Sequence, residues 1–170
     1  MLKRYMAVER SPFEQGSLLS GLAFLFFSVW LLFASVAGAA DVDGAPLIIH
    51  TGGGDRSVQV ELALTDAERM RGLMFRENLA PATGMLFVWP EERLVRMWMK
   101  NTLIPLDMVF LDDGGRVVHI ERNTVPHDLT PRGPEEQVLA VLELAGGEAA
   151  RLGISPGDQI THPALPGQTN

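Results

Sequence analysis

The stretch MWMKNTLIPLDMVFLD, from Met97 to Asp112, decides the fold class. Apolar residues alternate with other residues in both of its halves, a pattern typical of two β-strands joined by a bend. We expect strands at 96–101 and 106–112, with the bend near Leu103 and Ile104. The stretch therefore predicts an antiparallel hairpin.

Opposed positions in this hairpin place Lys100 across from Asp107. Side chains alternate between the faces of a strand, so Arg96 and Trp98 share the face of Lys100. A cross-strand ion pair stabilises by about 0.2–1 kcal/mol, and a salt bridge that fixes the register is a sufficient explanation. The functional alternative is a cleft for a small anionic or planar ligand. It makes Arg96, Trp98, Lys100 and Asp107 candidate ligand-binding residues, with Arg71 at the edge of the cleft.

Short strands and turns fill the rest of the domain. Further strands are expected at 47–50, 58–62, 85–89, 116–121, 137–144 and 159–161. The sequence Thr65-Asp66-Ala67-Glu68 predicts a capping box and a short helix to about Gly72. A second helical turn is expected at 148–152, and Asp112 to Gly115 is typical of a tight hairpin turn. These elements predict an all-β fold, a mainly antiparallel sandwich or barrel with one or two short helices.

The N-terminal segment predicts export. Three basic side chains occur in the first ten residues, residues 18–40 are almost wholly apolar, and 37–39 are small residues that signal peptidase accepts. We expect residues 1–40 to be a cleaved signal peptide, with a membrane anchor formed by 18–39 as the alternative. Both readings place the domain outside the cytoplasm, in the periplasm or the extracellular space. The remaining predicted parts are a linker at 41–46, a β-domain at 47–162 and a C-terminal tail at 163–170.

Composition excludes several classes of protein. The chain has no cysteine, so neither a disulfide scaffold nor a thiolate enzyme is expected. A net charge of -7 without a lysine or arginine cluster disfavours nucleic acid as a partner. No motif indicates a catalytic residue, a cofactor or a bound metal. We therefore expect a non-catalytic module that binds a small molecule or an envelope protein, and that meets a membrane only through an uncleaved N-terminal segment.

Two other functions stay open. One is a hydrolase that uses Asp107, His127 and Asp128, in which the aspartate orients the imidazole. The other is an envelope copper-binding protein, because thioether sulfur binds Cu(I). Six methionines belong to the predicted domain: Met70, Met74, Met85, Met97, Met99 and Met108. Met97, Met99 and Met108 fall on the apolar face of the predicted hairpin, which favours core filling over copper binding.

Four segments carry a resemblance to a known family. They are TDAERMRGLM (65–74), GMLFV (84–88), MWMKNTLIPLDM (97–108) and ARLGI-x-x-GD (150–158). They resemble the DUF192 family, small and often exported bacterial and archaeal proteins whose biochemical role is not established. The resemblance covers 47–161 and implies a compact, mostly antiparallel β-sandwich or barrel with short helices. It implies no catalytic residues.

Overall fold

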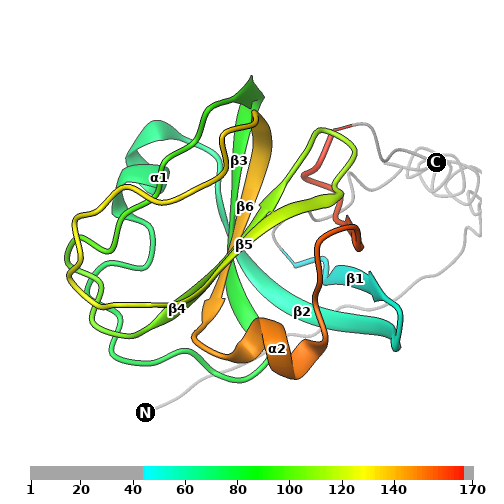
Figure 1. The fold of residues 1–170 in the computed structure, drawn as a ribbon, viewed down its shortest axis with the longest axis horizontal. Helices are drawn as coiled ribbons and strands as arrows, with labels where there is room; N and C mark the ends of the chain where they lie inside the picture. The colour runs from blue at the N-terminus through cyan, green and yellow to red at the C-terminus, as the bar shows by residue number, and fades with distance from the viewer. Residues whose placement is uncertain (1–43, 167–170) are drawn as a thin grey trace, which may run out of the picture. The chain divides into compact units, whose positions relative to one another are not determined.

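The computed structural model describes residues 44–166, and it confirms a mainly β domain with two short helices (Figure 1). In this part of the chain seven strands form one sheet, in the order β5-β4-β6-β3-β2-β1-β7. The strands are β1 (Leu47–Thr51), β2 (Gly54–Ala63), β3 (Thr83–Arg93), β4 (Leu106–Leu111), β5 (Val117–Thr124), β6 (Val138–Ala145) and β7 (Gln159–Thr161). The helices are α1 (Asp66–Arg71) and α2 (Glu148–Leu152), and neither described helix is long and apolar enough to cross a membrane. The predicted export segment 1–40 lies outside the described residues.

The sheet curls until its two edge strands approach each other. An isolated bridge pairs Arg116, immediately before β5, with Gln159 of β7. The amide of Val117 also donates to the carbonyl of Asp158 at 2.9 Å. Neighbouring strands are antiparallel except β2 and β3, which are parallel. The result is a curled half-barrel, and the contact between its edges protects backbone groups that an open sheet would leave unpaired.

The predicted hairpin between 96–101 and 106–112 is wrong. β4 pairs with β5 and β6, and residues 96–101 form a loop outside the named strands. Two backbone hydrogen bonds of 2.8 Å tie Met97 of this loop to Arg132, and Asn101 has a left-handed φ of 55°. Every residue of β4 is buried, so this strand needs a partner on both sides. The local sequence predicts residues 96–101 as the partner of β4, but the apolar strand β6 takes that place.

β3 is longer than the strand predicted at 85–89. It continues through Pro90 to Arg93, and its register with β6 shifts between Val88 and Arg93. Proline lacks the amide that a regular ladder needs, and an irregularity of this kind tolerates it. The end of β3 contributes Trp89, and its extension contributes Arg93, to the cleft that α1 also lines.

Apolar clusters cover both faces of the sheet. One is the larger core, which includes Leu86, Val109 and Leu142. The other contacts α1 and the 94–102 loop, and we name it the cleft-side cluster. Its buried members are Ala63, Leu73, Met85, Phe87, Val95, Met99, Leu106, Met108, Phe110, Val138 and Val141. The predicted core role is confirmed for Met99 and Met108, and Met97 packs half-buried against the same cluster.

Helix α1 begins with the predicted capping box. The hydroxyl of Thr65 accepts from the amide of Glu68 at 3.3 Å, and the Glu68 carboxylate accepts from the Thr65 amide at 2.8 Å. The helix ends at Arg71 because Gly72 adopts a φ of 46°. A Cβ on Gly72 would lie 3.1 Å from the ring of Phe87, so glycine also lets the helix end approach β3. The capping box and this close approach fix α1 beside the cleft-side cluster.

Candidate functional site

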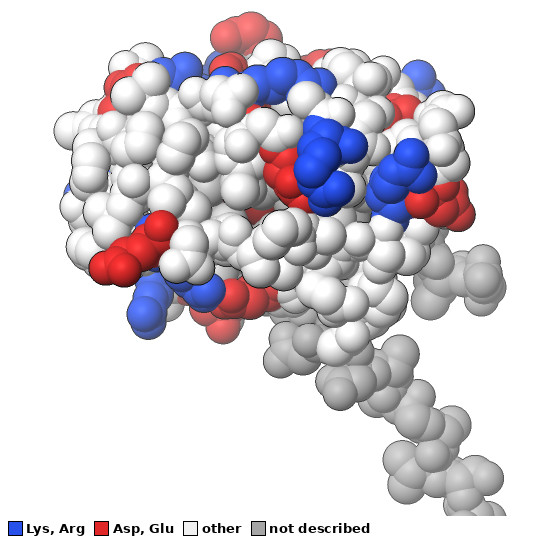
Figure 2. Space-filling model, turned by 90° about the horizontal axis from the view of Figure 1, so that it is seen from below, with Lys and Arg blue, Asp and Glu red and all other residues white. Residues whose placement is uncertain are grey.

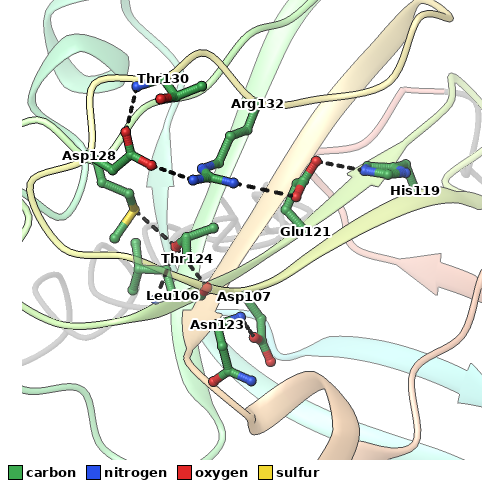
Figure 3. Close-up of polar contacts among 10 residues, drawn as sticks. Leu106, Asp107, His119, Glu121, Asn123, Thr124, Asp128, Thr130 and Arg132 are labelled. Carbon is green, nitrogen blue, oxygen red and sulfur yellow. Dashed lines mark hydrogen bonds and ion pairs between the residues drawn. The ribbon is translucent and has the colours of Figure 1, made fainter.

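Asp107 is an interior structural residue, so its predicted pairing with Lys100 is wrong. The side chain is fully buried in β4. Its two carboxylate oxygens accept from the backbone amides of Asn123 and Ala149, each at 2.8 Å. Figure 3 shows the contact with Asn123. Asp107 thus joins β5 to the start of α2, and it does not line the cleft described next.

The other four predicted ligand-binding residues do come together. Arg71, Arg96, Trp98 and Lys100 line one cleft between α1, β3 and the 94–102 loop. Its volume is about 710 Å³, and ligand pockets commonly measure roughly 300–1,000 Å³. The Lys100 ammonium lies 5.3 Å from the centre of the Trp98 ring. The structure therefore keeps the predicted group of cations beside an indole, although no hairpin holds it.

The walls of the cleft are apolar and aromatic. Leu73, Phe87 and Val95 are buried members of the cleft-side cluster that also line the cleft. The rings of Phe87 and Trp89 are stacked, with centroids 6.5 Å apart. The guanidinium of Arg69 lies over the Trp89 ring, 5.6 Å from its centre. Flat apolar surfaces of this kind suit a planar ligand.

Five cationic side chains line the cleft. Arg69 and Arg96 are already engaged: Arg69 donates to the Val88 carbonyl and the Asp66 carboxylate, and Arg96 pairs with Glu135. Three further cations line the cleft, exposed and without an ion pair in the described part of the chain. They are Arg71, Arg93 and Lys100. Positive charge with unused donors attracts an anionic group.

Glu143 of β6 is the site residue that sequence reasoning missed. Its side chain lines the cleft but is only 4% exposed, and burial raises its pKa to about 8. No hydrogen bond or ion pair reaches its carboxyl group from the residues that the structure describes. A carboxyl group without a partner in an apolar setting stays protonated near neutral pH. The available signal was a single acidic residue within the apolar run VLAVLELA, from Val138 to Ala145.

The residues of the hydrolase alternative do not form a catalytic group. His127 is exposed with a φ of 62°, and no hydrogen bond joins its side chain to Asp107 or Asp128 in the described chain. Asp128 instead accepts from the Thr130 amide and from Arg132, and these contacts lower its pKa to about 2. Figure 3 shows Asp128 in this network, in which Arg132 also approaches Glu121. The network ties the 125–134 connection to β5.

The structure divides the methionines between two settings. Met85, Met99 and Met108 are buried in the cleft-side cluster. The other three line the cleft: Met70, Met74 and Met97. Within the described residues, no group of three or more histidine, aspartate or glutamate side chains could hold a metal ion. Copper binding through methionine stays a prediction.

Comparisons with known proteins give a family and two similar crystal structures. The family model DUF192, described as an uncharacterised ACR, matches residues 47–162. A candidate transcription regulator from Sinorhizobium meliloti 1021 is 43% identical, with 69% of this chain and 92% of that chain covered and a TM-score of 0.67. A protein of unknown function from Novosphingobium aromaticivorans DSM 12444 is 44% identical, with 69% and 84% covered and a TM-score of 0.67. No curated protein matches this chain.

Proposed function

This chain belongs to the DUF192 family, and we propose that its domain is a non-catalytic, exported module that binds a small planar anion. The cleft between α1, β3 and the 94–102 loop is the binding site. The observation that carries the proposal is the contrast between this cleft and the rest of the chain. Five cationic and two acidic side chains line the cleft, although the net charge of the chain is -7.

The chemistry of the cleft supports this class of ligand. Trp89 and Trp98 offer flat surfaces against which a ring can pack. Arg71, Arg93 and Lys100 can bind a carboxylate or a similar anionic group at the mouth. Trp98 is 51% exposed, so its ring is accessible to an incoming ligand. No nucleophile with an adjacent base lines the cleft, and for this reason we propose binding and not turnover.

Export rests on the N-terminal sequence. A basic start followed by the apolar residues 18–40 and the small residues 37–39 is typical of a secretory signal. A cysteine-free domain is compatible with an oxidising compartment, because it has no thiol to oxidise. The proposed site of action is therefore the cell envelope or its exterior.

A small anion fits this chain better than DNA, although the similar protein from Sinorhizobium meliloti is described as a candidate transcription regulator. DNA binding requires a basic surface that follows phosphates over a long distance. On the face drawn in Figure 2, blue and red side chains lie next to each other and no broad blue area is seen. The cations of the cleft surround a hollow of about 710 Å³, which suits a small anion better than a duplex.

The test uses 4-isopropylbenzoate as a planar anionic probe and the neutral 4-isopropylbenzyl alcohol as its control. Isothermal titration calorimetry should detect the benzoate and little binding of the alcohol. Replacing Lys100 and Arg71 with alanine together should weaken benzoate binding about tenfold, because both cations line the cleft. The matched control is Arg116→Ala, which removes an exposed cation that does not line the cleft.

Two results would contradict the proposal. One is equal affinity for the benzoate and the alcohol, which would remove the role of charge. The other is an equal loss of affinity in the double variant and in Arg116→Ala, which would place the site elsewhere.

A further inference from the structure

Glu143 differs from the other buried acidic residues. Asp107 accepts from two backbone amides, and the Glu148 carboxylate accepts from the amide of Ala82 and from Arg151. Glu143 has no such partner among the described residues, yet its side chain lines the cleft. Its carboxyl oxygens are not among the fully solvent-excluded atoms that lack a partner in the described chain, so they face the cleft, where a ligand can supply the hydrogen-bond partner.

The positions directly opposite Glu143 on the two neighbouring strands carry no charged side chain that could pair with its carboxyl group. Its register neighbours are Met85 on β3 and Met108 on β4, both buried and apolar. One strand further on each side, the same row reaches Glu61 on β2 and Glu121 on β5. Strand spacing puts these carboxylates roughly 10 Å away. Each also has its own arginine, Arg76 for Glu61 and Arg132 for Glu121.

The remaining titratable groups that line the cleft come from α1, β3 and the 94–102 loop. They are Asp66, Arg69, Arg71, Arg93, Arg96 and Lys100. None of them perturbs Glu143, because burial is the only cause of its raised pKa. Glu143 is only 4% exposed and its register neighbours are Met85 and Met108, whereas Arg71, Arg93 and Lys100 are exposed. The carboxyl group therefore belongs to the buried, apolar part of the cleft, and these three cations belong to its solvent side.

From this arrangement we infer a specificity rule that rests on the proposed function. The cleft selects a planar anion that carries a hydrogen-bond acceptor, such as a carbonyl oxygen, at the end opposite its anionic group. The anionic group binds near Lys100 and Arg71, the ring packs beside Trp89, and the inner oxygen accepts a hydrogen bond from the protonated carboxyl of Glu143.

The chemistry of a neutral carboxylic acid explains the selection. Its hydroxyl donates one hydrogen bond, which a carbonyl oxygen can accept. A hydrocarbon at the same place leaves Glu143 without a partner. An ammonium group at the same place would itself be buried beside Met85 and Met108, and a neutral carboxyl group does not compensate its charge.

Three para-substituted benzoates test the rule, because they share the anionic group and the ring. They are 4-acetylbenzoate with an acceptor, 4-isopropylbenzoate with a hydrocarbon of similar shape, and 4-(aminomethyl)benzoate with a cation. Calorimetry at pH 6.5 should give about tenfold tighter binding of the acetyl compound than of the isopropyl compound. The aminomethyl compound should bind most weakly.

The variant Glu143→Gln isolates the protonation state. Its amide retains a donor but does not titrate. The wild-type preference for the acetyl compound should decline between pH 6.5 and 9.5, as Glu143 loses its proton, whereas the variant should keep the same preference throughout. Glu143→Leu should remove the preference at every pH and still bind 4-isopropylbenzoate, which shows that the variant is folded.

The outcomes separate this rule from the proposed function. Equal affinities for the acetyl and isopropyl compounds, or tightest binding of the aminomethyl compound, overturn the rule and leave an anion-binding cleft. A preference for the acetyl compound that does not change with pH in the wild type also overturns it. If none of the three benzoates binds, the proposed function and the rule fail together.

Discussion

At the scale of single residues, two buried carboxyl groups on neighbouring strands have opposite roles. Asp107 of β4 has both oxygens occupied by backbone amides and holds β5 and α2 in place. Glu143 of β6 has no partner and lines the cleft. The two side chains are buried to a similar extent, and they differ in whether hydrogen-bond partners reach the carboxyl group. A carboxyl group whose pKa is raised by burial and whose side chain lines a cleft is a candidate functional group.

Glu143 should make stability depend on pH. Its pKa rises from the ordinary 4.5 to about 8 on folding, so the folded state retains a proton that the unfolded state releases. Stability should therefore fall as pH rises from about 4.5 to about 8, by roughly 1.4 kcal/mol per pH unit at most. In Glu143→Gln this fall should be absent, and urea denaturation at pH 5, 6.5 and 8 measures it. The control is Glu77→Gln, an exposed position. Parallel pH profiles for wild type and Glu143→Gln would contradict a buried titrating carboxyl group.

Asp107 should matter for stability and not for ligand binding. In Asp107→Asn one of the two amides, from Asn123 or Ala149, meets an NH2 group and loses its acceptor. We expect a loss of about 1–3 kcal/mol in the free energy of unfolding. Asp113→Asn changes an exposed turn position and should be neutral. Equal denaturation midpoints for the two variants would show that the buried contacts of Asp107 are not needed.

At the scale of elements, the sequence predicted the features that depend on residues close together in the chain. The capping box of α1, the tight turn after β4 and the helical turn α2 depend on residues a few positions apart, and the structure contains all three. The partner of β4 is a long-range choice. A bend near Leu103 predicts a hairpin from local sequence, but a fully buried strand is more stable between β5 and β6. For the same reason the cleft was predicted only in part, since Glu143 reaches it from a distant strand.

The contact between β3 and β6 gives a test at this scale. A Cβ on Gly84 would lie 2.3 Å from the backbone oxygen of Glu143, and backbone in a central strand cannot move away without breaking the ladder. Gly84→Ala should therefore lower the free energy of unfolding by about 2–3 kcal/mol or more. Gly52→Ala adds the same methyl group where no atom lies within 4 Å and should have little effect. Thermal unfolding compares the two, and similar melting temperatures would refute this pairing of β3 and β6.

At the scale of the whole molecule, the curled sheet explains where the cleft can form. One face of the sheet is covered by the larger core cluster. The other face carries the cleft-side cluster, which α1 and the 94–102 loop cover incompletely. The incomplete cover leaves Trp98 half-exposed and gives Glu143 its access to the cleft.

Export belongs to the same scale. If residues 1–40 are a signal peptide, cell fractionation of a bacterial host that expresses the full chain should recover the domain outside the cytoplasm. N-terminal sequencing should then begin close to Asp41, after the small residues 37–39. A product that retains residue 1 in the membrane fraction would indicate the anchor instead. Recovery of the full chain in the cytoplasm would reject both forms of export.

The crystal structure of the protein with 4-acetylbenzoate is the most direct test of the account. The carboxylate should lie near Lys100 and Arg71, the ring beside Trp89, and the acetyl oxygen within hydrogen-bond distance of the Glu143 carboxyl group. Density for the benzoate outside the cleft would contradict the account. So would a ligand in the cleft whose carboxylate points inward, away from the cations at the mouth.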